Sequence, residues 1–295
     1  MDHLKYTETP VQEIHDLLLD SLGVRLLVKR EDLNHPQVSG NKWWKLKHNL
    51  SEAKRLGKKR LLTFGGAYSN HIYATAAAAR EIGLESVGII RGEEALPLNS
   101  TLTFAKEQAM HLHFVTREIY RGKTSEIFLD GLKEKFGDFY LIPEGGTNAL
   151  AVKGCEELGS RILAEIEFDI ACLPVGTGGT MAGLIRSFAG SKQLTGIAVL
   201  KGGEFLKAEI ELLEGHSHSN WNVLTSYHHG GYAKTTQALS EFIEIFNHQK
   251  KIPLEPVYSG KLMWAIFEEI KNGKFKRGTT ILALHTGGLQ TLTTP

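Results

Sequence analysis

The chain has 295 residues, 42% of them hydrophobic and 23% charged, so it can bury a large core in one large or two smaller domains. A formal net charge of +1 gives no electrostatic reason to expect nucleic acid or an acidic membrane surface as a partner. Two cysteines are too few for a disulfide scaffold, and the polar N-terminus lacks the apolar run of a signal peptide. We therefore expect a cytoplasmic protein without a membrane partner.

Short β-rich runs alternate with helical patterns along almost the whole chain. The predicted strands cover residues 24–28, 60–64, 86–90, 111–115, 139–142, 169–175, 196–200, 223–227, 256–258 and 279–284. The predicted helices cover residues 43–56, 70–82, 98–110, 125–136, 149–165, 179–189, 204–214, 235–249 and 260–272. Continuous apolar strands such as 170–175 predict sheets covered by helices on both faces, which indicates the α/β class with mainly parallel strands.

Glycine-rich turns follow several predicted strands, which is where open α/β sheets usually bind ligands. The most specific of these turns is a loop that follows an apolar strand and opens an apolar helix: Gly176, Thr177, Gly178, Gly179 and Thr180. Its backbone N–H groups lie at the positive end of the helix dipole, and with the two threonine hydroxyls they suit a phosphate group. It is neither a P-loop nor a dinucleotide-binding fingerprint, so an unrelated α/β nucleotide binder is a weaker alternative.

Lys42 is the candidate catalytic amine. It follows Gly40 and Asn41, just after a short apolar strand and at the start of an amphipathic helix, where backbone can approach a cofactor closely. Lys45 is near enough in sequence to lower the pKa of the Lys42 amine by charge repulsion. Local sequence alone favours a solvated lysine. Together with the 176–180 loop, however, a positioned amine is the minimum equipment for holding pyridoxal phosphate as a Schiff base.

Four histidines, His216, His218, His228 and His229, lie close in sequence, which makes a metal site conceivable. They have no accompanying acidic residues and no spacing typical of a metal cage, so we expect a solvated loop and no metal. Hydrolase motifs such as Gly-x-Ser-x-Gly and His-Glu-x-x-His are absent from the sequence.

Five motifs occur in order between about residue 28 and residue 290. They are Lys29-Arg30-Glu31-Asp32-Leu33, Ser39-Gly40-Asn41-Lys42-x-x-Lys45-Leu46, Gly65-Gly66-x-x-Ser69-Asn70, the 176–180 loop and Pro256-Val257-Tyr258-Ser259-Gly260-Lys261. Together they resemble the 1-aminocyclopropane-1-carboxylate (ACC) deaminase/D-cysteine desulfhydrase family. Its members are pyridoxal-phosphate enzymes with the tryptophan-synthase-β fold.

The resemblance implies pyridoxal-phosphate fold type II, with two three-layer α/β/α domains and the cofactor between them. The smaller domain would span residues 45–148, and the larger would combine residues 1–44 with residues 149–295. Such a split explains why no linker is visible in the sequence. The family also implies a homodimer that acts on a small amino acid.

Carried over to this sequence, the family pattern makes Lys42 the Schiff-base lysine and the 176–180 loop the phosphate site. Asn70 would hydrogen-bond the phenolic oxygen of the cofactor, and Ser69 would contact the substrate carboxylate or act near the reacting carbon. Tyr232 and Tyr258 would be the two active-site tyrosines.

The resemblance also places Ser259 near the pyridine nitrogen, where ACC deaminases carry a glutamate. A neutral hydroxyl does not demand a protonated nitrogen, and the weaker electron sink suits α,β-elimination. The implied activity is that of a lyase or deaminase that converts a small amino acid, D-cysteine first, to a 2-keto acid and ammonia. ACC deaminase itself is the alternative, and a pyridoxal-phosphate-binding or sensing protein with little turnover is the alternative from another class.

The sequence departs from the family pattern beside two of these motifs. Trp43 and Trp44 replace the Thr-Arg pair that is common after the lysine, and Tyr68 and His71 stand where members often have glutamines. Because Trp43 falls on the apolar face of the helix, we expect the tryptophans to be core. A reshaped substrate pocket is the alternative.

Overall fold

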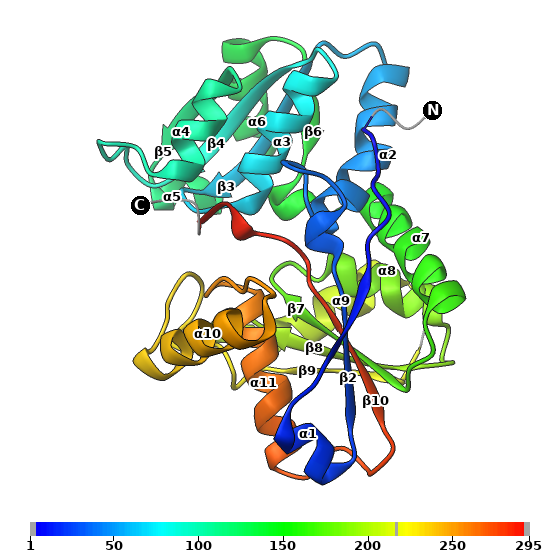
Figure 1. Ribbon diagram of the computed structural model, residues 1–295. Helices are drawn as coiled ribbons and strands as arrows, with labels where there is room; N and C mark the ends of the chain where they lie inside the picture. The colour runs from blue at the N-terminus through cyan, green and yellow to red at the C-terminus, as the bar shows by residue number, and fades with distance from the viewer. Residues whose placement is uncertain (1–3, 216–217, 292–295) are drawn as a thin grey trace.

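The computed structural model describes residues 4–215 and 218–291, which form two α/β domains (Figure 1). The chain enters the smaller domain, at the top of Figure 1, along helix α2 (Asn41–Arg55) and returns along helix α7 (Ala149–Glu165). These two helices pack against each other. The chain therefore crosses between domains within packed helices, which is why no flexible linker is visible in the sequence.

The larger domain is built on a six-stranded sheet drawn from both halves of the chain. In spatial order its strands are β1 (Val11–Ile14), β2 (Arg25–Lys29), β10 (Thr280–Leu284), β7 (Ile170–Val175), β8 (Gln193–Ala198) and β9 (Trp221–Leu224). The edge strand β1 pairs antiparallel with β2, and the pairs from β2 through β9 are parallel.

The smaller domain contains a four-stranded parallel sheet. In spatial order its strands are β5 (Met110–Val115), β4 (Glu85–Arg91), β3 (Arg60–Gly66) and β6 (Tyr140–Ile142). All four strands lie inside the range 45–148 predicted for this domain. The predicted boundary between residues 44 and 45 falls within α2, so the domain limits themselves stay a prediction.

Helices cover both faces of each sheet. The remaining helices are α1 (Leu17–Leu22), α3 (Asn70–Glu81), α4 (Ser100–Glu107), α5 (Arg117–Arg121), α6 (Glu126–Phe136), α8 (Gly179–Phe188), α9 (Leu206–Glu214), α10 (Gln237–Lys250) and α11 (Ser259–Lys271). Short 3₁₀ turns are η1 (Glu31–Leu33), η2 (Glu144–Gly146), η3 (Gly203–Phe205) and η4 (Leu289–Thr291). No helix among residues 4–215 and 218–291 is long and apolar enough to cross a membrane.

The strands are continuously apolar because both of their faces are buried. Along β2, Leu26 and Val28 pack in the cluster that includes α10 and α11, whereas Leu27 packs in the cluster that includes α2, α7 and α8. In the smaller domain, α5 and α6 cover one face of the sheet and α3 and α4 cover the other. The three-layer α/β/α architecture is therefore confirmed.

The predicted strand at residues 256–258 is wrong, because this segment is a turn that leads into α11. The buried carboxylate of Glu255 accepts hydrogen bonds from the backbone N–H groups of Val257, Tyr258 and Ser259 at 2.7–2.8 Å. The N–H groups that a strand would have used are thus held by a side chain. The sequence reading also missed the short elements β1, α1 and α5.

Candidate active site

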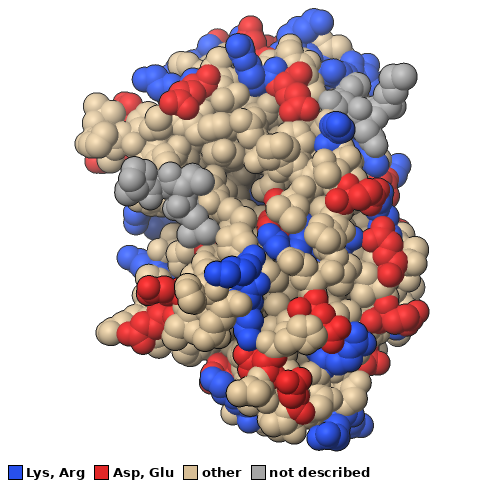
Figure 2. All heavy atoms as spheres, viewed as in Figure 1, with Lys and Arg blue, Asp and Glu red and all other residues tan. Residues whose placement is uncertain are grey.

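A cavity of about 310 Å³ opens between the two domains. It lies at the carboxyl ends of parallel strands, since Gly66 ends β3 and Val175 ends β7, and both line it. Figure 2 shows the surface hollowed where the domains meet, with charges of both signs scattered over the surrounding face. The lining includes these predicted site residues: Lys42, Ser69, Asn70, Gly176, Thr177, Gly178, Thr180, Tyr232 and Tyr258.

Lys42 lies in the first turn of α2, with its half-buried side chain in the cavity lining. Its Nζ donates to Oδ1 of Asn41 at 3.2 Å, and Nδ2 of Asn41 donates to Oγ1 of Thr180 at 2.8 Å. Asn41 therefore connects the amine to the 176–180 loop. Desolvation first, and the charge of Lys45 second, lower the pKa of Lys42 to about 7. Near neutral pH a substantial fraction of the amine is thus an unprotonated nucleophile.

Gly40 is required immediately before this helix. Its φ is 69°, and a Cβ there would overlap the carbonyl oxygen of Thr286. The same carbonyl accepts a hydrogen bond from the backbone N–H of Asn41 at 3.3 Å. Close backbone approach at Gly40 therefore ties the start of α2 to the segment that follows β10.

Lys45 is a site residue that the sequence reading treated as no more than a charged neighbour. It is 2% exposed, and its Nζ donates to the carbonyl of Gly145 at 3.0 Å and to Oγ1 of Thr147 and Thr177 at 2.9 and 3.3 Å. Within the described part of the chain no carboxylate pairs with it, and desolvation lowers its pKa to about 8. A buried amine joining two loops without a counter-ion indicates an anion site.

The loop beside Lys45 supplies the rest of that site. Helix α8 begins after Gly178 with no side chain capping it, which leaves its first N–H groups available. These N–H groups, the threonine hydroxyls and the Lys45 amine form a donor set that fits the phosphate of pyridoxal phosphate. The predicted loop thus fits the cofactor, together with Lys45.

Ser69 and Asn70 begin helix α3 on the opposite, small-domain side of the cavity. Oγ of Ser69 accepts from the N–H of Ile72 at 3.3 Å, and Oδ1 of Asn70 accepts from Nε2 of Gln290. His71 follows, buried, with Nε2 2.7 Å from Oγ1 of Thr63. Desolvation, Lys42 and Lys45 hold the pKa of His71 well below its usual value, so its ring is neutral.

Tyr232 and Tyr258 are in contact with each other in the cavity lining, with their hydroxyl oxygens 3.4 Å apart and their ring centroids 6.1 Å apart. Desolvation raises the pKa of both hydroxyls. At neutral pH both are protonated and can donate. Buried Lys261 positions this pair, because its Nζ donates to the carbonyls of Gly231 and Val199 at 2.7 and 3.1 Å.

Ser259 is not among the residues that line the cavity. It is 1% exposed, and its Oγ accepts from the N–H of Glu255 at 2.9 Å and lies 3.2 Å from Oε1 of that residue. Its role near the pyridine nitrogen stays a prediction. Tyr68 is 53% exposed and also lies outside the lining.

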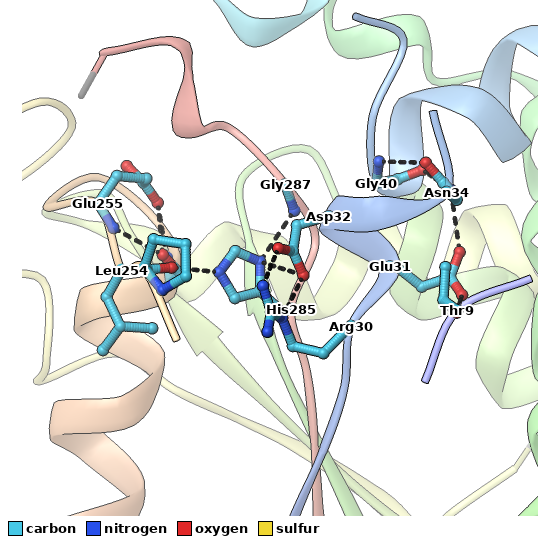
Figure 3. Close-up of polar contacts among 12 residues, drawn as sticks. Thr9, Arg30, Glu31, Asp32, Asn34, Gly40, Leu254, Glu255, His285 and Gly287 are labelled. Carbon is cyan, nitrogen blue, oxygen red and sulfur yellow. Dashed lines mark hydrogen bonds and ion pairs between the residues drawn. The ribbon is translucent and has the colours of Figure 1, made fainter. Parts of the chain in front are cut away.

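The two tryptophans are core, as expected, and do not shape the cavity. Trp43 and Trp44 are each 2% exposed, and Nε1 of Trp44 donates to Glu31 at 2.7 Å. The Glu31 carboxylate also accepts from Tyr6, and from Thr9 and Asn34 as Figure 3 shows. Oδ1 of Asn34 accepts from the N–H of Gly40 at 2.9 Å, and Nδ2 of Asn34 donates to the carbonyl of Gly40 at 3.0 Å. Glu31, from the 29–33 motif, thus supports the start of the helix that carries Lys42 through Asn34 and Trp44.

A second buried network, shown in Figure 3, supports the segment after β10. Arg30 makes two hydrogen bonds to Asp32 at 2.9 and 2.7 Å, and Asp32 lies 3.5 Å from Nδ1 of His285. Nε2 of His285 lies 2.7 Å from the carbonyl oxygen of Pro253. The network therefore joins the 29–33 motif to the segment that contains Thr286.

The histidine cluster holds no metal-ligand group of three or more side chains within the residues that the structure describes. Nδ1 of His218 lies 3.1 Å from Glu214, and Nδ1 of His229 lies 2.9 Å from Oγ1 of Thr236. His216 lies outside the described residues.

Comparison with known proteins gives consistent matches over most of the chain. Residues 3–287 match the family model described as pyridoxal-phosphate dependent enzyme. The chain is 31% identical over 292 residues to the mitochondrial bifunctional D-cysteine desulfhydrase/1-aminocyclopropane-1-carboxylate deaminase of Arabidopsis thaliana, covering 90% of this chain and 73% of that protein. It is 30% identical over 300 residues to a provisionally named 1-aminocyclopropane-1-carboxylate deaminase of Pyrococcus furiosus, covering 96% and 90%. The crystal structure of an ACC deaminase homologue has a TM-score of 0.85 and 27% identity, covering 98% and 91%.

The fold, the cavity and these matches define a pyridoxal-phosphate-dependent lyase. Within that class, the chain belongs to the ACC deaminase/D-cysteine desulfhydrase family. The predicted α/β fold class, family and cofactor are confirmed.

Proposed function

We propose that this enzyme removes the β-substituent of a small amino acid by α,β-elimination, giving a 2-keto acid and ammonia, with D-cysteine as the leading substrate. The observation that carries the proposal is that Lys42, with its pKa lowered to about 7, and two protonated tyrosines line the same cavity. A base and a pair of acids are the groups that an elimination needs. The names of the relatives, which include a D-cysteine desulfhydrase, support the same reaction class.

Lys42 holds the cofactor and then takes the α-proton of the substrate at Nζ, while the 176–180 loop and Lys45 hold the phosphate. When bound, pyridoxal phosphate withdraws electrons from the α-carbon and so makes its proton acidic. Asn70 donates to the phenolic oxygen, and Ser69 with the first N–H groups of α3 receives the substrate carboxylate.

Tyr232 and Tyr258 complete the elimination. The Cα–H proton goes to Lys42, the Cβ–S electron pair leaves with sulfur, and a tyrosine hydroxyl supplies the proton that converts the thiolate to hydrogen sulfide. Water then hydrolyses the unsaturated amine to pyruvate and ammonia. The raised pKa of both tyrosines keeps them protonated for this step.

The test is product analysis with the holoenzyme on D-cysteine, L-cysteine and ACC. Sulfide with pyruvate supports elimination from cysteine, whereas 2-oxobutyrate from ACC with no sulfide would assign ACC deaminase instead. Tyr258→Phe should lower kcat for cysteine by about 10²–10⁴-fold, which is the usual loss for a general acid. If the wild-type holoenzyme forms no keto acid from any of the three, the proposal is wrong, and a low-turnover cofactor-binding protein becomes the better reading.

The assembly and location are also proposed. The family pattern supports a homodimer, to be tested by light scattering of the holoenzyme. The two cysteines, Cys155 and Cys172, are free and buried, which supports a reducing compartment such as the cytoplasm.

A further inference from the structure

Arg91 is a cavity-lining cation that pairs with no carboxylate among the residues that the structure describes. It ends strand β4 and pairs in register with Gly66, which ends β3. A Cβ placed on Gly66 would lie 3.4 Å from Nη2 of Arg91, so the guanidinium lies over the turn that leads to Ser69. Within the described part of the chain its guanidinium makes no hydrogen bond or ion pair, and it lies 5.6 Å from the ring centroid of Tyr120.

The charges that line the cavity are unbalanced. Lys42, Lys45 and Arg91 are basic, and Glu144 is the acidic member of the lining. Glu144 already pairs with Lys123 at 3.2 Å. Because Lys42 and Lys45 serve the cofactor in the proposed function, the charge of Arg91 remains for the substrate.

The position of Arg91 suits a contact with the β-substituent of the substrate and not with its α-carboxylate. In the proposed function the α-carboxylate is received by Ser69 and the N-terminus of α3. Arg91 and Tyr232 line the same cavity, and the charge of Arg91 opposes the rise that burial causes in the pKa of the Tyr232 hydroxyl. In the proposed function Tyr232 belongs to the pair that protonates the leaving group. The guanidinium is therefore near the place where the β-substituent leaves.

We infer that Arg91 binds an anionic oxygen group, a carboxylate or a phosphate, on the β-substituent of the substrate. This inference rests on the proposed function and adds to its substrate class, beside cysteine, small amino acids with an anionic leaving group. In the elimination of O-phosphoserine, the α-proton goes to Lys42 and the Cβ–O electron pair leaves with phosphate, which takes its proton from the tyrosine pair. Water then gives pyruvate and ammonia, as for cysteine.

Two pairs of ligands test the inference on the holoenzyme. Aspartate and alanine differ by a distal carboxylate and have no leaving group, so their dissociation constants can be measured from the visible absorption of the cofactor. O-phosphoserine and O-acetylserine differ in the charge of the leaving group, and kcat/KM of the elimination is measured for each. Both enantiomers of each are used. The control variant is Arg80→Met, which removes an exposed arginine of the same domain that is not in the cavity lining.

Arg91→Met should weaken aspartate binding roughly 10–100-fold and lower kcat/KM for O-phosphoserine by a similar factor. The dissociation constant of alanine and kcat/KM for O-acetylserine should stay within about twofold of wild type. Arg91→Lys should fall between wild type and Arg91→Met, and it remains informative if Arg91→Met does not fold. Equal weakening of alanine and aspartate would overturn the inference, because Arg91 would then bind the α-carboxylate. Unchanged dissociation constants for both alanine and aspartate would overturn the inference as well.

The failure of this inference is distinguishable from failure of the proposed function. Turnover of O-acetylserine by wild type, with no effect of Arg91→Met on any ligand, would refute the inference and leave the elimination standing. Binding of aspartate that depends on Arg91, with no keto acid from any compound, would refute the elimination and leave Arg91 as an anion-binding residue.

Discussion

Gln290 donates a hydrogen bond from its side-chain Nε2 to Oδ1 of Asn70. Gln290 comes from the segment after β10, and Asn70 begins α3 of the smaller domain, so the contact joins the two sides of the cavity. Because Oδ1 is taken, the Nδ2 group of Asn70 is turned to donate elsewhere. We infer that this contact sets the amide orientation that the phenolic oxygen of the cofactor needs.

Gln290→Glu should invert that orientation, because a carboxylate accepts where the amide donated. The amide of Asn70 then turns its Nδ2 toward residue 290 and its oxygen toward the cofactor. We expect pyridoxal-phosphate affinity to fall roughly tenfold, and about fivefold in Gln290→Ala, measured by fluorescence titration of the apoprotein. Equal affinities of wild type and both variants would show that Gln290 does not position Asn70.

Trp44→Phe should destabilise the holoenzyme by about 1.5–3 kcal/mol in urea unfolding, because it removes one donor from the buried Glu31 carboxylate. Trp43→Phe is the matched control. The Trp43 indole lies in the same hydrophobic cluster, but its Nε1 has no hydrogen-bond partner in the described structure. The free energy of unfolding should therefore fall less in Trp43→Phe than in Trp44→Phe. A larger loss in Trp43→Phe would mean that ring packing, and not the bond to Glu31, decides the stability of this region.

Lys45→Met should make the apoprotein more stable near pH 7, by about 1–3 kcal/mol, because it removes a buried charge that lacks a counter-ion. The same variant should bind pyridoxal phosphate roughly 100-fold more weakly. Lys153→Met, an exposed lysine of α7, is the control. A variant that loses stability but keeps its cofactor affinity would show that Lys45 is structural and does not hold phosphate.

The pH dependence of apoprotein stability follows from the same lysines. Their pKa values, about 7 for Lys42 and about 8 for Lys45, lie below the ordinary value of 10.5. Above these lowered values the unfolded chain binds more lysine protons than the folded chain does. The two lysines should therefore make the free energy of unfolding rise with pH from about 7 to about 8.5. Above that range the buried thiols and tyrosines, whose pKa values are raised, act in the opposite direction. Urea unfolding from about pH 7 to about pH 8.5 should show a smaller rise in Lys45→Met. An unchanged slope would contradict the lowered pKa of Lys45.

Ser259→Ala should change the visible absorption of the holoenzyme if the hydroxyl also reaches the pyridine nitrogen, as the family pattern predicts. It should also cost about 1 kcal/mol, because Ser259 hydrogen-bonds Glu255. Glu255→Gln separates these effects, since it weakens the turn and leaves Ser259 in place. The same spectrum in Ser259→Ala as in wild type would remove Ser259 from the cofactor site.

Much of the fold could be predicted from sequence because its signals are local. Successive side chains of a strand point to opposite faces, so a strand covered on both faces is apolar throughout, as in 170–175. The glycine-rich 176–180 loop directly follows that strand. The segment at 256–258 misled the strand reading because its N–H groups are held by the side chain of Glu255, which periodicity does not show.

The missed parts of the site depend on contacts far apart in the chain. Lys45 contacts residues about 100 and 132 positions away, and Gln290 contacts one 220 positions away. The spacing of Lys42 and Lys45 did carry a signal, since residues three apart lie on the same helix face. Arg91 belongs to no local motif, and it reaches the cavity because β4 pairs with β3 and places it beside Gly66.

We propose above all that the amine of Lys42 holds the cofactor. The most direct test is reduction of the holoenzyme with borohydride, followed by peptide mapping by mass spectrometry, with Lys42→Ala and Lys45→Met analysed alongside. We predict a phosphopyridoxyl group on Lys42, its loss in Lys42→Ala together with the visible absorption band, and its retention on Lys42 in Lys45→Met at saturating cofactor. A phosphopyridoxyl group on Lys45, or on neither lysine, would contradict the account.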